Sequence, residues 1–134
     1  AIFRASQSAA KIMLKQGSGS IINMSSQMGH IGAPNRTLYC TTKHAVEGLT
    51  KALAVELAPE GIRVNAVAPT FIDTPFTRPM FKNIEFKETV ENNIALGHIG
   101  TVEDVAAAVI FLASPGAAMI TGESLKVDGG WTAW

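Results

Sequence analysis

The sequence predicts an α/β fold built on a parallel sheet with helices on both faces. Short apolar runs of strand length alternate with longer segments whose apolar residues recur at helical spacing, and Gly and Pro separate the segments. The composition of 47% hydrophobic and 16% charged residues excludes a disordered chain and supplies a core. Because no repeat, low-complexity tract or linker divides the 134 residues, we expect a single domain over residues 1–134.

The first expected elements are a helix over residues 1–15 and a strand near 20–24. Apolar residues recur at helical spacing in the first segment, and the sequence GSGS at 17–20 ends it. Ile21 and Ile22 then form a short apolar run with turn signals on both sides. Such a run is typical of a buried strand in a parallel sheet.

The longest expected helix covers residues 37–57. It carries an apolar stripe at steps of three and four residues, made of Val46, Leu49, Leu53 and Leu57. Glu47 and Lys51 are four residues apart, so we expect them to pair on the outer side of the helix. Pro59 and Gly61 end this helix.

The remaining strands are expected at 62–69 and 124–130. Between them, residues 70–100 read as an irregular stretch with one helix near 84–95. A last helix follows, which begins at Thr101 with a capping box and ends near Ser114. Strands that alternate with helices imply right-handed crossovers, and therefore a parallel sheet of three strands.

Charge and cysteine content exclude several classes of protein. Eleven Lys and Arg balance eleven Asp and Glu, so nothing favours a binder of nucleic acid or of acidic membranes. No apolar run reaches the length of about 18 residues that a membrane span needs, and the first residues do not form a signal peptide. Cys40 is the single cysteine, which excludes a disulfide framework and a cysteine-based zinc site. We expect a cytoplasmic protein with no metal site.

Tyr39 and Lys43 form the first candidate for chemistry. Tyr39 is the only tyrosine, and Lys43 follows it by four residues at the start of a helix, so both side chains share one face. A nearby ammonium favours the phenolate form of a tyrosine, and the pair is therefore a candidate acid/base. Alone the pattern is weak, because such a pair also arises by chance in helices without catalytic roles.

Ser25 and Ser26 lie at the carboxyl end of the first strand, the edge where parallel sheets bind ligands. Ser26 precedes Tyr39 by 13 residues, across a loop that can fold back over the helix start. A serine hydroxyl beside that tyrosine could hold a carbonyl oxygen. On spacing alone, the alternative that this segment is only turn chemistry stays open.

With these residues in place, the chain resembles the classical short-chain dehydrogenases/reductases. The likeness runs through GSIINMSS, YCTTK, KHAVEGLTKALAVELAPEGIRVNAVAP, IDTP, TVEDVAAAVIFLAS and ITGESLKVDGG. It implies a partial Rossmann-like doubly wound sheet, with the three later strands parallel and adjacent in chain order. It also implies the carboxyl-terminal part of that domain without the amino-terminal dinucleotide-binding half, because no glycine-rich phosphate-binding turn is present.

The resemblance assigns roles to particular residues. Tyr39 would be the general acid/base, Lys43 would support it and hydrogen-bond the nicotinamide ribose, and Ser26 would orient the substrate oxygen. Three residues after the second strand would contact the nicotinamide of NAD or NADP: Pro69, Ile72 and Thr74. The family's usual glycine after that proline is Thr70 here, which lacks the permissive backbone angles of glycine.

The resemblance implies an oxidoreductase that transfers a hydride between a nicotinamide cofactor and a small carbonyl or secondary alcohol. A sugar, a polyol and a ketoacyl thioester are all candidate substrates, because the expected pocket walls at 27–36 and 76–98 carry no recognisable code. In the family the second of these segments is a mobile substrate lid, and ordinary packing of its aromatic residues is the alternative. The competing hypothesis is a module without catalysis that acts only in assembly.

We expect a homo-oligomer that forms through the helices at 1–15 and 37–57, which resemble those of the family's dimer interface. The apolar stripe of the second helix, together with Phe3, Ala10 and Leu14 of the first, exceeds what a three-stranded sheet needs to cover.

Overall fold

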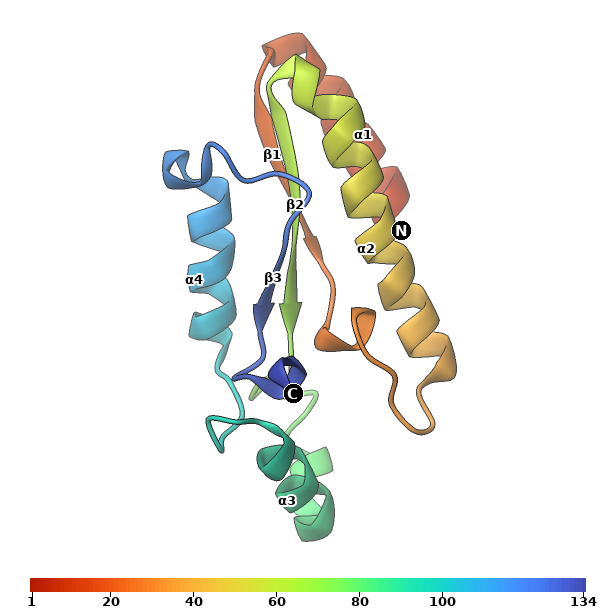
Figure 1. Cartoon of the computed structure of the whole chain (residues 1–134), viewed down its shortest axis with the longest axis vertical. Helices are drawn as coiled ribbons and strands as arrows, with labels where there is room; N and C mark the ends of the chain where they lie inside the picture. Colours follow the sequence, from red (N-terminus) through yellow and green to blue (C-terminus); the bar gives the residue numbers. More distant parts are fainter.

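The computed structural model describes all residues, 1–134, as a three-stranded parallel sheet with helices on both faces (Figure 1). The helices are α1 (Ile2–Gln16), α2 (Thr37–Leu57), α3 (Ile84–Asn93) and α4 (Val102–Ala113), and the strands are β1 (Gly19–Met24), β2 (Ile62–Pro69) and β3 (Ser124–Val127). The strand order is β1-β2-β3, and both neighbouring pairs are parallel. The predicted fold class and strand order are therefore confirmed.

The sheet separates two layers of helices. Figure 1 shows α1 and α2 on one side of the strands and α4 on the other. Successive residues of a strand point to opposite faces, so β2 serves both layers. Ile62 and Val64 join a cluster with Ala10 of α1 and with Ala54 and Leu57 of α2.

On the opposite face, Val67 of β2 packs against Leu112 of α4 and Ala117. Arg63 also points to this side, where its guanidinium donates to the carbonyl oxygen of Leu112 at 2.8 Å and to that of Ser114 at 3.3 Å. These carbonyls lie at the carboxyl end of α4, where the last backbone carbonyl groups have no partners within the helix and attract positive charge.

The carboxyl end of the long helix α2 follows the sequence signals. The helix ends at Leu57, and the chain turns through Gly61, whose φ is +74°. A β-carbon at Gly61 would come within 2.8 Å of the carbonyl oxygen of Gly17, so this turn requires glycine for both its backbone angle and its close approach. At α4, the expected capping box between Thr101 and Asp104 is present.

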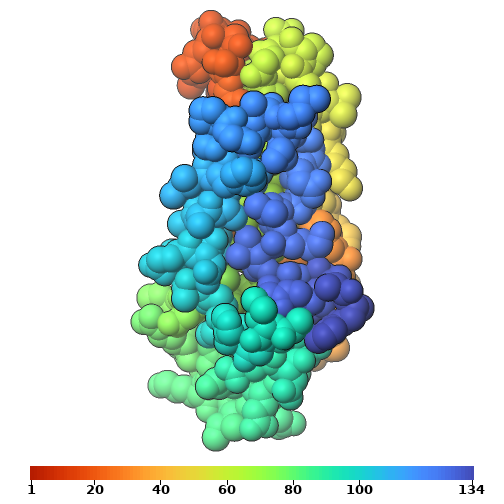
Figure 2. Space-filling view, turned by 60° about the vertical axis from the view of Figure 1, so that its left-hand side comes forward, coloured from red at the N-terminus to blue at the C-terminus, as the bar shows by residue number.

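Residues 70–100 lie beyond the carboxyl ends of the strands, at the lower end of the molecule (Figures 1 and 2). Phe71 is the centre of an aromatic group there. Its ring centroid lies 6.0 Å from Phe81, 5.6 Å from Phe86 and 5.8 Å from Trp131. Phe81 and Phe86, expected either in a lid or in ordinary packing, are thus packed together, whereas Phe76 of the same segment is exposed.

The expected outer pair of Glu47 and Lys51 is wrong. Glu47 is only 6% exposed and faces the sheet, where its partners are His30 and Ser124. The spacing to Lys51 satisfied the local helix rule, but the direction of the Glu47 side chain is set by contacts from distant parts of the chain.

The chain itself covers only part of the two apolar stripes. Ala10 of α1 and Val46 and Leu57 of α2 are buried within the chain. Phe3 and Leu14 remain 56% and 44% exposed. Much of the stripe on α2 therefore covers the chain's own sheet. No helix combines the length and the apolar character that crossing a bilayer requires.

Candidate active site

A cavity of about 380 Å³ opens at the carboxyl ends of β1 and β2. The 3₁₀ turn Gln27–Gly29, the start of α2 and the segment after β2 form its walls. Its apolar lining is Met28, Phe71, Ile72, Phe76 and Met80, and its polar lining is Ser26, Gln27, Arg36, Tyr39, Thr70, Thr74 and Thr77. This mixture of apolar walls and a few polar groups is typical of a site for a small molecule.

Ser26 is fixed at the end of β1 by the turn that follows it. The backbone N–H of Ser25 donates to the carbonyl oxygen of Val67 at 2.8 Å, which extends the pairing with β2. Ser26 then caps the 3₁₀ turn, as its Oγ accepts from the Met28 N–H at 3.2 Å and donates to Gln27 Oε1 at 3.1 Å. Ser26 is only 6% exposed, so its hydroxyl has a defined direction at the cavity wall.

Tyr39 and Lys43 occupy successive turns of α2. Tyr39 is 44% exposed and lines the cavity, so its hydroxyl is open to a bound molecule. Lys43 Nζ lies 5.6 Å from the centroid of the Tyr39 ring and donates to the carbonyl oxygen of Met24 at 3.0 Å. That bond ties the ammonium to the end of β1, one helical turn from Tyr39.

The other expected contacts fall into two groups. Ile72 and Thr74 line the same cavity as Ser26 and Tyr39. Pro69 does not line it, because it pairs with Val127 of β3 and is buried inside the sheet.

Thr70 is the observation that bears on a cofactor. It lines the cavity, and its buried Oγ1 has no hydrogen-bond partner within the chain. A buried hydroxyl without a partner is unfavourable, so a polar group bound here would be stabilised. The next residues are held in place by Thr77, whose Oγ1 lies 2.9 Å from that of Thr74 and donates to the Ile72 carbonyl oxygen. The residues at this wall therefore suit the amide-bearing ring of a nicotinamide.

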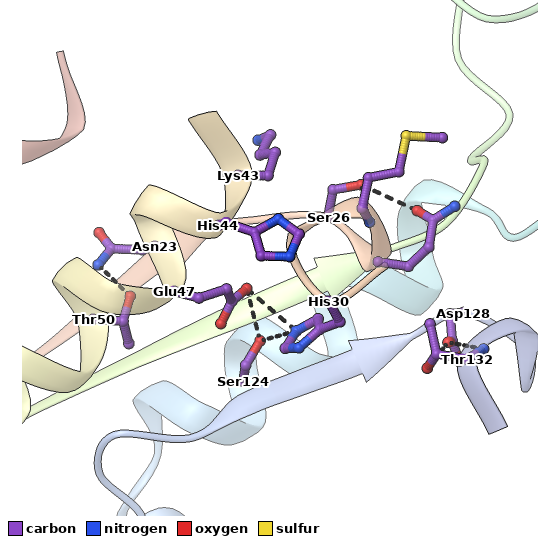
Figure 3. A network of polar contacts seen from close by, with 12 residues as sticks. Asn23, Ser26, His30, Lys43, His44, Glu47, Thr50, Ser124, Asp128 and Thr132 are labelled. Atoms are coloured by element: carbon purple, nitrogen blue, oxygen red, sulfur yellow. Dashed lines mark hydrogen bonds and ion pairs between the residues drawn. The ribbon is translucent and has the colours of Figure 1, made fainter. Parts of the chain in front are cut away.

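Two polar networks lie on the α1/α2 face of the sheet (Figure 3). In the first, Asn23 of β1 donates to Thr50 of α2 at 3.0 Å and accepts from Ser6 of α1 at 3.2 Å. In this way one strand residue joins both helices.

The second network contains His30, Glu47 and Ser124, which we call the Glu47 cluster. Glu47 Oε1 accepts from Ser124 Oγ at 3.1 Å and lies 3.3 Å from His30 Nε2. His30 Nε2 is also 3.0 Å from Ser124 Oγ. The cluster connects the loop after Ser26 with α2 and β3, so it sets how the Ser26 turn sits against the helix that carries Tyr39 (Figure 3).

Sequence reasoning placed Gln27 and Arg36 within the expected wall at 27–36 but singled out neither of them, and it missed the Glu47 cluster. Arg36 precedes Tyr39 by three residues, a spacing that places both side chains near one face, and this was the available signal. Gln27 follows Ser26 directly. The Glu47 cluster had no local signal, because Glu47 and Ser124 are 77 residues apart.

Asp128 fixes the turn after β3. Burial raises the pKa of this carboxyl, but hydrogen bonds from the Thr132 side chain and from the Thr132 and Gly130 backbone N–H groups outweigh it and hold the pKa below its usual range. The Thr132 hydroxyl donates to Oδ2 at 2.7 Å. The turn brings Trp131 to the aromatic group around Phe71.

Comparison with known proteins shows which family the chain matches. The model of the family described as Enoyl-(Acyl carrier protein) reductase matches residues 1–132. The 3-oxoacyl-[acyl-carrier-protein] reductase FabG of Thermotoga maritima is 43% identical over 129 residues, 96% of this chain and 52% of the relative. The L-xylulose reductase of Mus musculus is 42% identical over 134 residues, 99% of this chain and 55% of the relative.

Solved structures agree in fold. A gluconate 5-dehydrogenase of Burkholderia cenocepacia, in complex with NADP and tartrate, superposes with a TM-score of 0.95 at 33% identity, over 99% of this chain and 52% of that one. A 4-hydroxyisoleucine dehydrogenase complexed with NADH gives a TM-score of 0.94 at 35% identity, over 98% of this chain and 55% of that one. The chain spans about half the length of the proteins it matches.

Proposed function

The chain belongs to the short-chain dehydrogenase/reductase family, and on that premise we propose that it carries the catalytic residues of an NAD(P)-dependent oxidoreductase. The substrate would be a small carbonyl compound or the corresponding secondary alcohol. One observation carries the proposal: Ser26 and Tyr39 line one cavity, with Lys43 Nζ 5.6 Å from the Tyr39 ring centroid.

In the direction of reduction, Tyr39 gives its hydroxyl proton to the substrate oxygen. The Ser26 hydroxyl turns from Gln27 Oε1 and donates a hydrogen bond to the same oxygen, which holds the carbonyl in place. Lys43, tied to Met24, stabilises the charge left on the phenol. A bound nicotinamide supplies the hydride that reduces the carbonyl carbon. In the direction of oxidation, Tyr39 takes the proton from the alcohol.

For the cofactor, we propose that Thr70, Ile72 and Thr74 hold the nicotinamide. The unpartnered Thr70 hydroxyl supports this assignment. Pro69 contributes indirectly, because as the last residue of β2 it sets where this segment leaves the sheet. NAD and NADP both remain candidates, since the named structures contain NADP in one case and NADH in the other.

The catalytic proposal assigns to this chain the carboxyl-terminal part of the family's domain. A dinucleotide-binding half is then needed for turnover, and the coverage of about half of each relative supports this division.

We also propose assembly of two or more copies through α1 and α2, supported by the exposed side chains of Phe3, Ile12, Leu14 and Val55. The same exposed side chains favour the alternative function, a module that acts only in assembly. For the compartment we propose the cytoplasm, which suits a single cysteine without a disulfide partner.

The test is oxidation of NADH and NADPH in the presence of sugars, keto acids and ketoacyl thioesters, measured with the chain alone and with the natural polypeptide that contains it. Tyr39→Phe removes the transferable proton and keeps the ring, so turnover should fall on the order of 10²-fold or more. The matched control is Thr42→Ala. It removes an exposed hydroxyl of the same helix, which donates to the backbone carbonyl oxygen of Tyr39. Unchanged turnover of the Tyr39→Phe variant contradicts the proposal. No turnover with any substrate favours the assembly module, which sedimentation then tests.

A further inference from the structure

The cavity that holds Ser26 and Tyr39 contains one charged side chain, that of Arg36. Its remaining lining is apolar, hydroxyl-bearing or amide-bearing, and includes no Asp or Glu. The chain forms ion pairs at His30–Glu47, at Arg78–Asp73 and at Lys87–Glu91, so Arg36 takes part in none of them. Arg36 is exposed, and an arginine that lines a small-molecule cavity without an acidic partner in the chain favours an anion there.

The acidic residue nearest to the lining segment after β2 already has a partner. Asp73 belongs to the segment that forms the wall after β2, and its carboxylate accepts from Arg78 Nε at 2.7 Å and Nη2 at 3.2 Å. The start of α2 offers no acid either, since the first turn contains none and no side chain caps it. The backbone N–H groups at this helix start therefore add positive potential beside Arg36 instead of cancelling it.

A second, independent donor lies in the same cavity. Gln27 is only 2% exposed and lines the cavity, and its Nε2 has no hydrogen-bond partner within the chain. Its Oε1 is occupied by the Ser26 hydroxyl, which leaves the Nε2 group as a donor. A buried donor without an acceptor is unfavourable until a ligand supplies one.

From these two unpartnered donors we propose that the substrate of this site carries a carboxylate, which Arg36 binds while the reacting carbonyl lies at Ser26 and Tyr39. This inference rests on the proposed function. The planar guanidinium matches a carboxylate with two parallel hydrogen bonds. A cavity of about 380 Å³ has room for a small molecule of this kind. The substrate class is thus the small keto acids and hydroxy acids.

The test compares small keto acids with their methyl esters, which keep the ketone and lose the charge. The protein is the natural polypeptide that contains residues 1–134. With the acids, Arg36→Gln should lower kcat/KM by about 10- to 100-fold, the loss expected for a charge-assisted hydrogen bond, mainly through KM. With the esters, and in the KM of the cofactor, the same variant should change little. Lys82→Gln is the control, because it removes an equal charge from an exposed residue near Met80 that does not line the cavity.

A measurement without turnover keeps the inference separate from the catalytic proposal. Malonate has two carboxylates and no reducible ketone, and its binding can be followed by calorimetry. The wild-type protein should bind malonate more tightly than dimethyl malonate, and Arg36→Gln should remove the difference. Equal binding of acid and ester by the wild-type protein overturns the inference even where reduction is observed. Preference for phosphorylated over carboxylated substrates, or an Arg36→Gln effect confined to the cofactor KM, also overturns it. If malonate binds as expected but no carbonyl is reduced, the catalytic proposal fails and the carboxylate site stands.

Discussion

The two faces of the sheet belong to the same three strands but carry different kinds of side-chain contact. On the α4 face, Val67, Leu112 and Ala117 form an apolar cluster with further aliphatic side chains of α4 and β3, and the polar side chains of Arg63 and Asn65 bond to backbone groups. On the α1/α2 face, polar side chains bond to one another, in the pair of Asn23 and Thr50 and in the Glu47 cluster (Figure 3). The candidate catalytic residues Tyr39 and Lys43 lie on the helix that carries this polar side.

This difference shows which face positions the site and which mainly stabilises the fold. Apolar packing is tolerant of direction, because the free energy of burial depends mostly on area. Hydrogen bonds require a particular geometry, so buried polar groups fix how two elements are placed. The α1/α2 face therefore holds the Ser26 turn and α2 in register. The cost is visible in Glu47 Oε2 and Ser25 Oγ, two buried atoms without a partner.

The largest effect on stability is expected from a substitution in the apolar cluster of the α4 face. Leu112 is only 1% exposed, and Leu112→Ala should leave a cavity and lower the free energy of unfolding by about 2–5 kcal/mol. Denaturant unfolding measures this change. The control is Ile110→Ala on the same helix, which is 68% exposed and should change stability by less than about 0.5 kcal/mol. Turnover per folded molecule should stay close to that of the wild-type protein. A large loss of turnover in the folded Leu112→Ala variant would remove the distinction between the faces.

A substitution in the Glu47 cluster of the α1/α2 face should change stability less, and activity more, than Leu112→Ala. Glu47→Ala removes the acceptor for Ser124 and the partner of His30, which should lower the free energy of unfolding by about 1–3 kcal/mol. Since the cluster holds the loop after Ser26 against α2, kcat should fall more than in Leu112→Ala.

The matched variant is Glu47→Gln, which keeps the shape and an oxygen that accepts from Ser124. It should retain more stability and more turnover than Glu47→Ala. Unfolding curves and kcat, measured on both variants, give the comparison. If Glu47→Ala lowers stability but leaves kcat at the wild-type value, the Glu47 cluster is structural and does not position the site.

The contrast between the faces also explains how far the sequence could predict the structure. Helical periodicity is a local signal, and the predicted bounds of α2 agree with Thr37–Leu57 because an apolar stripe and a Pro–Gly stop define them. The Ser26, Tyr39 and Lys43 candidates came from spacing and from resemblance. The burial of Glu47 depends on Ser124, which only the order of the strands brings near. Pro69 lies outside the cavity lining, because it pairs with Val127 of β3, and its expected contact with the nicotinamide stays a prediction. Arg36 lies outside any motif, and its meaning is visible only once the whole cavity lining is known.

The smallest effect concerns the turn after β3, where the two faces meet. The pKa of Asp128 is held low in the folded chain, although burial alone would raise it, because Thr132 and Gly130 donate to the carboxylate. A carboxyl with a lowered folded pKa adds stability above its unfolded pKa of about 3.9, and that stability is lost as the pH falls through the folded value. As the pH falls below this range, the turn should therefore loosen and Trp131 should leave its position 5.8 Å from the Phe71 ring. Tryptophan fluorescence against pH follows this step, and Asp128→Asn should weaken the turn at neutral pH and remove the acid-dependent change. Glu123→Gln, an exposed carboxyl next to β3, is the control and should leave the change in place. An acid transition that is identical in the wild-type and Asp128→Asn proteins would assign it to other carboxyls of the chain.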